Sequence, residues 1–466
     1  MVDGSPDRYE AIIIGSGQAG TPLALALAAA GRRTALVERD HVGGTCINEG
    51  CTPTKTMIAS ARIAHLVSRA GDYGISCSGA TVDLERVRAR KRGIVASFRA
   101  GSERRLAEAE NLDLLRGEGR FVATDRIEVR DADGSTRLVE APMVFLNVGT
   151  RPRRPDLAGI GRITPLDSTS IMELGDVPEH LIVLGGGYVG VEFAQMFRRF
   201  GARVTIVQRR DQLLPREDPD IAKLVADVLM EEGIEVELGA EAVEVAPHGV
   251  NGVELVIRNT GSERAICGSH LLMAAGRQPN TDSLNLEIAG VRTDERGYII
   301  VNDRLKTNVP GIYALGDVKG GPAFTHISYD DYRVARANLL DGGSASIRDR
   351  LVPYAVFVDP QLGRIGLSER EARAAGIPHH VATMPMAYVA RAIEVAESRG
   401  MIKAIVHAET DRILGAAVFG LEGGELMTVI QVAMMGDLPY TALRDGVFAH
   451  PTLAESLNNL FADLPK

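Results

Sequence analysis

The chain has 466 residues, of which 45% are apolar and 24% charged, and its formal net charge is −9. This length predicts about two to four domains, and the acidic balance argues against nucleic acid or an anionic membrane surface as a partner, since both need a basic face. No run of about 18 apolar residues occurs and the first ten residues lack the pattern of a secretory signal, so we expect no membrane span and a cytoplasmic location.

The first predicted unit, residues 9–40, reads as strand, glycine-rich turn, helix and strand. Gly15, Gly17 and Gly20 form the pattern G-x-G-x-x-G, which gives a tight turn, close approach to a pyrophosphate and close packing of helix on strand. Glu38 ends the second strand, where a carboxylate can accept hydrogen bonds from a ribose. The strand and helix around the glycines favour a dinucleotide-binding unit over ordinary turn glycines.

Cys46 and Cys51 follow, separated by four residues, in a chain with four cysteines. They could be metal ligands, a structural staple or a redox pair. No second Cys pair lies nearby to complete a zinc site, and a staple would close only a short loop. A regular helix would place the two Cα atoms about 8–9 Å apart, too far for a disulfide. A helix beginning near Pro53 would put Cys51 at its positive end and, with Lys55, would favour a thiolate.

The following segments alternate in pattern. Residues 81–110 predict a charged helix, and residues 119–149 predict strands with a turn at Asp133–Gly134. Further along the chain, residues 235–259 predict hairpins. From about Pro353 we expect a separate α+β domain, with antiparallel strands in residues 354–368 and 401–420 and helices in 425–435 and 454–461.

A second unit with the same order of strand, glycine-rich turn, helix and strand covers residues 180–210. Its fingerprint glycines are Gly185, Gly187 and Gly190. Gln208 stands where an acidic residue would select NAD, and Arg209 and Arg210 follow it. An arginine there can hold a 2′-phosphate, so the sequence favours NADPH over NADH. The alternative is that the two arginines form a solvated strand end.

The stretch "GGTCINEGC" followed by "PTK", together with both fingerprints, resembles the flavoprotein pyridine nucleotide-disulfide oxidoreductases, over essentially the whole chain. That family includes lipoamide dehydrogenase, glutathione reductase and mercuric reductase. The resemblance implies an α/β fold with two Rossmann-type domains and a C-terminal α+β dimerisation domain. It places the FAD-binding domain in residues 1–150 and 277–345, the NAD(P)H-binding domain in 151–276 and the dimerisation domain in 346–466.

The resemblance also implies site residues. Those expected around FAD are Gly15, Gly17, Gly20, Glu38, Lys55, Gly119, Gly149, Asp317 and Thr325. Those expected around NADPH, with NADH as a possible substitute, are Gly185, Gly187, Gly190, Glu192, Arg209, Arg210 and Gly276. In this reading Lys55 and Glu192 pair beside the flavin and the nicotinamide, Asp317 binds the ribityl chain, and Gly119 belongs to a turn on the flavin side.

The catalytic residues implied by the resemblance are the cysteine pair and two residues of "FAHPTLAESLNNLF". His450 would be the acid/base and Glu455 would orient it, whereas standing alone they read as a loop histidine before a helix. Cys51 would face the flavin and Cys46 would attack substrate. The chain would form a homodimer in which His450 serves the cysteine pair of the other subunit.

The substrate stays open at this point: a small disulfide or another small oxidant. A mercuric reductase-like enzyme is an alternative, although the printed C-terminus "NNLFADLPK" lacks that enzyme's cysteine pair. Lipoamide dehydrogenase is another, although it usually uses NAD. A redox-inactive nucleotide-binding subunit is a third. We expect no metal site, and we expect Cys77 and Cys267 to be inert core residues.

Overall fold

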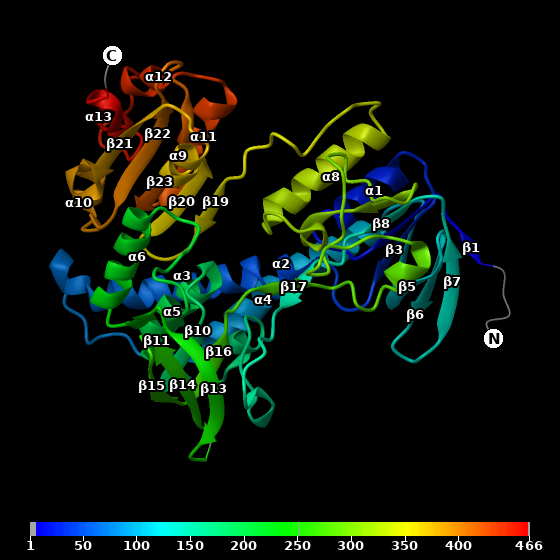
Figure 1. Ribbon diagram of the computed structural model, residues 1–466, viewed down its shortest axis with the longest axis horizontal. Helices are drawn as coiled ribbons and strands as arrows, with labels where there is room; N and C mark the ends of the chain where they lie inside the picture. The colour runs from blue at the N-terminus through cyan, green and yellow to red at the C-terminus, as the bar shows by residue number, and fades with distance from the viewer. Residues whose placement is uncertain (1–5, 251, 465–466) are drawn as a thin grey trace. The chain divides into compact units, whose positions relative to one another are not determined.

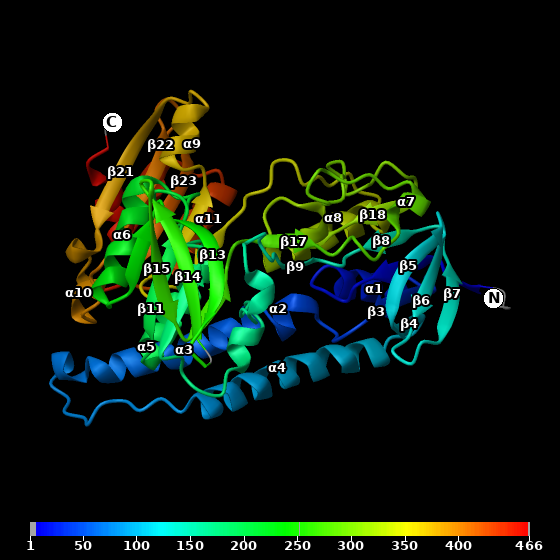
Figure 2. The same ribbon diagram turned by 60° about the horizontal axis from the view of Figure 1, so that its bottom comes forward.

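The computed structural model describes residues 6–250 and 252–464, so residues 1–5 of the segment tested for a secretory signal lie outside it. The chain divides into two compact units (Figures 1 and 2). The first contains residues 1–56, 88–153 and 276–350, and the second contains residues 57–87, 154–275 and 351–466. Two helices have residues in both units, α3 (Cys51–Ser68) and α4 (Leu84–Ala107).

A parallel five-stranded sheet forms the centre of the first unit, in the order β18-β8-β2-β3-β4. The order reverses between β2 and β8, which is the switch point where open α/β sheets bind nucleotides. The strands are β2 (Ala11–Ile14), β3 (Thr34–Glu38), β4 (Leu112–Arg116), β8 (Val144–Leu146) and β18 (Ile312–Ala314).

Side chains of β2 alternate between two layers, as the period of a strand requires. Ala11 and Ile13 belong to the core beneath helices α1 (Gly20–Ala29) and α8 (Thr325–Leu339). Ile12 and Ile14 belong to the core shared with a second sheet. That sheet has the order β1-β7-β6-β5, with β1 (Asp7–Arg8), β5 (Glu118–Ala123), β6 (Arg126–Arg130) and β7 (Thr136–Glu140). Both faces of the parallel sheet are therefore covered.

The other elements of the first unit connect these layers. They are α2 (Gly44–Asn48), β9 (Thr150–Pro152), β17 (Arg277–Pro279), α7 (Leu286–Ala289) and η4 (Gly316–Lys319). The predicted helix in residues 81–110 is observed as α4. The predicted turn at Asp133–Gly134 is confirmed, since it joins β6 to β7, which pair antiparallel.

The second unit repeats the nucleotide-binding arrangement with a parallel sheet in the order β12-β11-β10-β16. Its elements are β10 (His180–Leu184), α5 (Tyr188–Phe200), β11 (Arg203–Gln208), α6 (Pro219–Glu231), β12 (Glu235–Leu238) and β16 (His270–Met273). In both fingerprints the last glycine is required by close packing. A Cβ on Gly20 would lie 2.1 Å from the Gly15 carbonyl oxygen, and one on Gly190 would lie 1.9 Å from that of Gly185.

An antiparallel sheet of β13 (Glu241–His248), β14 (Gly252–Asn259) and β15 (Ser262–Gly268) packs against this parallel sheet. The prediction of hairpins in residues 235–259 is therefore correct for β13 and β14. It is wrong for β12, which follows α6 and extends the parallel sheet beside β11.

The C-terminal part of the second unit is an antiparallel sheet in the order β19-β20-β23-β22-β21. Its strands are β19 (Tyr354–Val356), β20 (Gln361–Gly366), β21 (His379–Pro385), β22 (Met401–His407) and β23 (Ile413–Gly420). Its helices are α9 (Glu369–Ala374), α10 (Ala390–Glu394), α11 (Gly423–Met435), α12 (Tyr440–Arg444) and α13 (Ser456–Ala462). Short 3-10 helices complete the unit: η1 (Ala70–Tyr73), η2 (Ile160–Arg162), η3 (Ser170–Glu173) and η5 (Met386–Tyr388). The α/β fold class and the antiparallel strands predicted after Pro353 are confirmed, whereas the exact domain boundaries stay predictions.

Candidate active site

The cysteine pair lies where two helices meet end to end. Cys46 is in the short helix α2, which ends at Asn48, and Cys51 is the first residue of α3. The segment is therefore not one regular helix, and α3 begins two residues earlier than the expected start near Pro53. The two residues are thiols rather than a disulfide, and Cys51 is exposed whereas Cys46 is half-buried. Cys51 thus occupies the positive end of a long helix, where a thiolate is stabilised.

The two thiols have different environments. A hydrogen bond with Cys51 raises the pKa of Cys46 well above its usual range, and burial adds to this effect. A hydrogen bond to Thr325 and the charge of Lys55 oppose it without reversing it. Cys51 Sγ also lies 3.2 Å from Thr325 Oγ1. The arrangement therefore favours a negative charge on Cys51 and a proton on Cys46.

Asp317, which is predicted to bind the flavin, lies in the short 3-10 helix η4 before α8. Its carboxylate accepts a hydrogen bond from Thr150 Oγ1 at 3.3 Å, and burial raises its pKa above the usual range. A buried ionic network, which sequence reasoning missed, holds η4 in place. Asp331 accepts from the Gly316 amide at 2.7 Å, pairs with Lys319 Nζ at 3.2 Å and pairs with an Arg350 amino group at 2.7 Å. The only available signal was an acidic residue on the buried face of the helix in residues 325–339.

The first fingerprint fits a dinucleotide. The buried Glu38 carboxylate accepts hydrogen bonds from the Ser16 amide at 3.0 Å, the Ser16 hydroxyl at 2.6 Å and the Asp40 amide at 2.9 Å. A carboxylate offers about four acceptor sites, so one is left for a ribose hydroxyl. The Asn147 side chain, also missed by the sequence, donates to the Gly15 carbonyl at 3.0 Å and supports the turn.

Gly149 and Gly119 differ in their surroundings. Gly149 has a φ of +65° and open space where a Cβ would point, as a ligand-facing turn allows. Gly119 is buried in strand β5, and its absent Cβ would point at Val37 and Ile127. The expectation that Gly119 lies in a turn is therefore wrong, because its position belongs to the packing between two sheets.

The second fingerprint has a neutral side chain, Gln208, at the position that Glu38 occupies in the first fingerprint. Gln208 Oε1 accepts weakly from the Gly186 amide, at 3.5 Å, where Glu38 accepts from Ser16. A Cβ on Gly187 would meet only open space, which leaves room for a pyrophosphate. Arg209 and Arg210 are both exposed beyond the end of β11. Gly276 has a φ of +106° in the first unit.

Glu192 is buried on α5, and its Oε1 accepts a hydrogen bond from the Phe357 amide at 2.7 Å. Lys55 belongs to the other compact unit. The expected pairing of Lys55 with Glu192 stays a prediction.

His450 and Glu455 are brought together at the start of α13. His450 Nδ1 lies 2.8 Å from Glu455 Oε2, and the His450 side chain is 67% exposed. The carboxylate fixes the ring orientation and would stabilise a protonated imidazole. A loop histidine held in this way can take and return a proton at Nε2.

Two expectations about the remaining cysteines are wrong. Cys77 and Cys267 are both exposed rather than buried in a core.

Among the helices of the described residues, none combines the length and apolarity that a bilayer crossing requires.

Two dinucleotide-binding folds, a thiol pair at a helix N-terminus and a carboxylate-held imidazole define an enzyme that moves electrons between a pyridine nucleotide and a dithiol. The family model described as pyridine nucleotide-disulphide oxidoreductase matches residues 9–331, and the model of that family's dimerisation domain matches residues 352–461. The chain belongs to the pyridine nucleotide-disulphide oxidoreductase family. Members of this family use FAD and take electrons from NAD(P)H, and the dimerisation domain indicates a homodimer.

Individual relatives cover nearly the whole chain. The probable pyridine nucleotide-disulfide oxidoreductase RclA of Escherichia coli (strain K12) is 41% identical over 461 residues, 98% of this chain and 99% of its own length. Mercuric reductase of Lysinibacillus sphaericus is 33% identical over 97% of this chain and 82% of its own length. A solved structure of the HOCl-induced flavoprotein disulfide reductase RclA from Escherichia coli, in complex with Cu(II), is 39% identical with a TM-score of 0.90, covering 98% and 100% of the two chains.

Proposed function

We propose that this protein is an NADPH-dependent flavoprotein reductase that passes two electrons through the Cys46–Cys51 pair to a small disulfide. The observation that carries this proposal is the asymmetry of the pair. Cys51 lies at the N-terminus of α3 and contacts Thr325, while the pKa of Cys46 is raised by Cys51. One thiol is thus suited to carry charge and the other needs a base.

The preference for NADPH is supported by the end of strand β11. Gln208 has no charge to repel a 2′-phosphate, whereas Glu38 at the equivalent place in the first unit has one. Arg209 and Arg210 are exposed at that point. Guanidinium groups form strong bidentate hydrogen bonds with phosphate.

Bound FAD supplies the two-electron relay between the nicotinamide and the thiols. The Cys46–Cys51 disulfide takes up the two electrons and the proton that NADPH donates as hydride, which breaks the S–S bond and gives the Cys46 thiol and the Cys51 thiolate. Cys46, once deprotonated, attacks a substrate disulfide, forms a mixed disulfide and releases the first substrate thiolate, which takes up the proton of Cys46. The Cys51 thiolate then attacks the sulfur of Cys46, re-forms the internal disulfide and releases the second substrate thiolate, which takes up a proton from solution.

The His450–Glu455 pair supplies the proton transfers of this cycle. Since the pKa of Cys46 is raised, attack at neutral pH requires a base, and the leaving substrate thiolate requires an acid. We propose that His450 performs both steps for the cysteine pair of the other subunit of the dimer. Asp317, Thr325 and the first fingerprint would hold the flavin, and the second fingerprint with Glu192 would hold the nicotinamide nucleotide.

Reduction of a metal ion is the second candidate function. It is supported by the similarity to RclA, for which structures in complex with Cu(II) are solved, and by the similarity to mercuric reductase. The His450–Glu455 pair favours the disulfide, because a leaving thiolate needs a proton whereas an ion bound by thiolates does not. Lipoamide is a third acceptor to test, since dihydrolipoyl dehydrogenases are also similar to this chain.

The test is a panel of acceptors at fixed NADPH: oxidised glutathione, lipoamide, cystine, Cu(II), Hg(II) and a quinone. We expect one disulfide to exceed the quinone in kcat/KM, and we expect Cys46→Ser to abolish that activity while quinone reduction continues. The proposal fails if no disulfide is reduced, or if Cys46→Ser leaves disulfide turnover unchanged. A preference for Cu(II) or Hg(II) that survives His450→Gln would favour the metal-ion alternative.

The cytoplasmic location stays a proposal. Cys77 and Cys267 are exposed free thiols, which suit a reducing compartment. Fractionation of cells that produce the protein tests it.

A further inference from the structure

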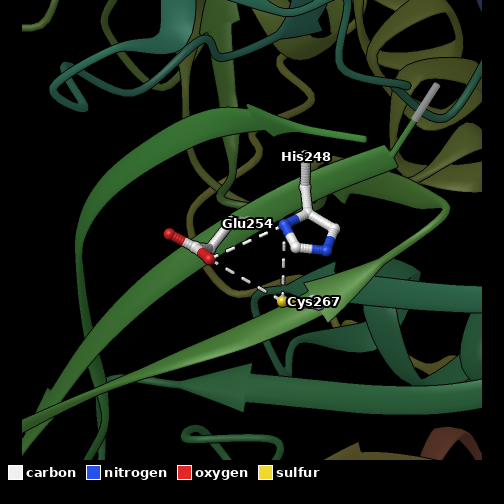
Figure 3. A group of neighbouring side chains, drawn as sticks. All are labelled: His248, Glu254 and Cys267. Atoms are coloured by element: carbon white, nitrogen blue, oxygen red, sulfur yellow. Dashed lines mark hydrogen bonds and ion pairs between the residues drawn. The ribbon is translucent and has the colours of Figure 1, made fainter. Parts of the chain in front are cut away.

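A group of three side chains on the β13–β15 sheet has no part in the reaction described above. His248 Nδ1, Glu254 Oε2 and Cys267 Sγ point toward one another (Figure 3). The distances are 3.7 Å between Nδ1 and Oε2, 3.8 Å between Sγ and Nδ1, and 3.8 Å between Sγ and Oε2. An imidazole, a carboxylate and a thiol thus converge from three neighbouring strands.

The strand register explains this convergence. Glu254 pairs directly with Cys267 across β14 and β15. On the other side Glu254 pairs with Ala246, so His248, two residues further along β13, is its diagonal neighbour. Val253, Leu255 and Ile266 fill the core on the inner face. Because strand side chains alternate, the three donors are therefore on the outer face.

We propose that His248, Glu254 and Cys267 bind one divalent transition-metal ion of the Zn²⁺ type, with water in the fourth position. Zn²⁺ takes thiolate, imidazole and carboxylate ligands, and sites with three protein ligands keep an open fourth position. A thiolate and a carboxylate together balance the charge of a divalent ion.

The spacing fits such an ion. Tetrahedral bonds to sulfur, nitrogen and oxygen would separate the donor atoms by roughly 3.4–3.6 Å. The observed separations of 3.7–3.8 Å need only a contraction of a few tenths of an ångström. The backbone of Cys267 is also held in place, since its carbonyl oxygen lies 2.8 Å from Nδ1 of the buried His180.

The three proposed ligands belong to the second compact unit, whereas the cysteine pair belongs to the first. The test must keep the pair from binding metal, so it uses the FAD-loaded enzyme with Cys46 and Cys51 oxidised to a disulfide. A thiol titration that counts two thiols per chain verifies that state. Equilibrium dialysis against Zn²⁺, with metal analysis, then gives stoichiometry and affinity.

We expect one Zn²⁺ per chain in the parent enzyme. Cys267→Ser should abolish binding, and His248→Ala and Glu254→Gln should each weaken it by at least roughly tenfold, as loss of one of three ligands predicts. Two variants are matched controls and should bind normally. Cys77→Ser removes the other exposed thiol, and Glu263→Gln removes an exposed carboxylate of the same sheet that pairs with Arg258.

Alkylation provides an independent readout. Zn²⁺ should protect Cys267 from iodoacetamide in the parent enzyme but not in His248→Ala, while Cys77 reacts equally with and without the ion. Peptide mass spectrometry measures both residues in one sample. The proposal is overturned if Cys267→Ser still binds one Zn²⁺, if the two ligand variants bind as tightly as the controls, or if Zn²⁺ leaves Cys267 unprotected.

Discussion

The sulfur of Cys51 lies 3.2 Å from the hydroxyl oxygen of Thr325, and each residue is the first of its helix. The N-termini of α3 and α8 therefore meet at one thiol. Each helix N-terminus carries a partial positive charge, so both favour an anion at this point. We therefore expect this convergence to stabilise a thiolate on Cys51 without any metal ligand.

Thr325→Val is expected to destabilise the Cys51 thiolate, because it removes the hydroxyl at 3.2 Å and keeps the shape of the side chain. In the enzyme reduced anaerobically with NADPH, the long-wavelength thiolate-to-flavin absorption band should weaken and its titration should move to higher pH. Thr325→Ser is the control that keeps the hydroxyl and should keep the band. An unchanged band in Thr325→Val would exclude this role.

Cys51→Ser is expected to make Cys46 more reactive. The hydrogen bond with Cys51 is the first cause of the raised pKa of Cys46, and a raised pKa keeps a thiol protonated over the neutral range. Removing that cause should lower the pKa and increase alkylation by iodoacetamide at pH 7 by roughly tenfold per unit of pKa. The rate measured against pH checks this. The partner for comparison is Cys46 in the fully reduced parent enzyme, and equal profiles would contradict the assignment.

His450→Gln is expected to lower disulfide turnover by about 10²–10⁴-fold, the usual contribution of a general acid/base. Reduction of the enzyme by NADPH should proceed at its normal rate, because His450 acts only after the internal disulfide has opened. Glu455→Gln keeps the imidazole and loses the carboxylate at 2.8 Å, so a smaller loss with an altered pH profile is expected. Stopped-flow measurement of the two half-reactions separates these effects. Slow reduction by NADPH in His450→Gln would place the histidine elsewhere in the cycle.

Replacing both Arg209 and Arg210 by Ala is expected to raise KM for NADPH by roughly 10–100-fold, as loss of one charge-assisted hydrogen bond or two predicts. KM for NADH should change little, because NADH lacks the 2′-phosphate. Arg39→Ala is the matched control: it removes an exposed arginine next to Glu38 in the first fingerprint unit. Steady-state kinetics with both nucleotides give the answer, and equal changes for NADPH and NADH would refute phosphate recognition.

Arg199→Leu is expected to destabilise the protein by about 3 kcal/mol at pH 7, as breaking a buried ion pair does. Arg199 is 5% exposed and pairs with Glu232 at 2.7 Å and Asp359 at 2.6 Å. Burial alone would raise the pKa of each carboxylate, but the bonds from Arg199 outweigh it and hold both pKa values below the usual range.

A depressed carboxylate pKa stabilises the fold above the unfolded pKa, about 4, and this stabilisation is lost as pH falls through the folded pKa. The deficit of Arg199→Leu should therefore stay constant from pH 7 to about pH 5 and shrink on further acidification toward about pH 2. Arg203→Leu is the control, since the pair of Arg203 with Glu235 is exposed at 62% and 47% and should contribute about 0–1 kcal/mol. Thermal unfolding measured across this pH range checks both variants, and a deficit for Arg199→Leu no larger than that of the control would contradict the argument.

Local patterns in the sequence were sufficient for most of the fold. The repeated strand, glycine turn and helix predicted both parallel sheets, because Gly20 and Gly190 must pack against the carbonyls of Gly15 and Gly185. Predictions were less certain for segments whose sequence pattern is compatible with more than one arrangement. Strand β12 reads like part of a hairpin, and only the sheet beside β11 decides its pairing. Gly119 reads like a turn residue, and only the packing of β5 on Val37 shows otherwise.

The sequence by itself determined which residue types could do the chemistry: two cysteines before a helix, two nucleotide fingerprints, and a histidine followed by a glutamate five residues later. The tertiary structure decided which side chains and charges surround these residues. Thr325 reaches Cys51 across 274 residues of sequence, and the buried Asp331 network that fixes Asp317 has no local pattern. The outer-face group of His248, Glu254 and Cys267 likewise exists only through strand register. Electrostatic and metal-ligand interactions depend on distances of a few ångströms, and such distances between remote residues are set by packing rather than by sequence spacing.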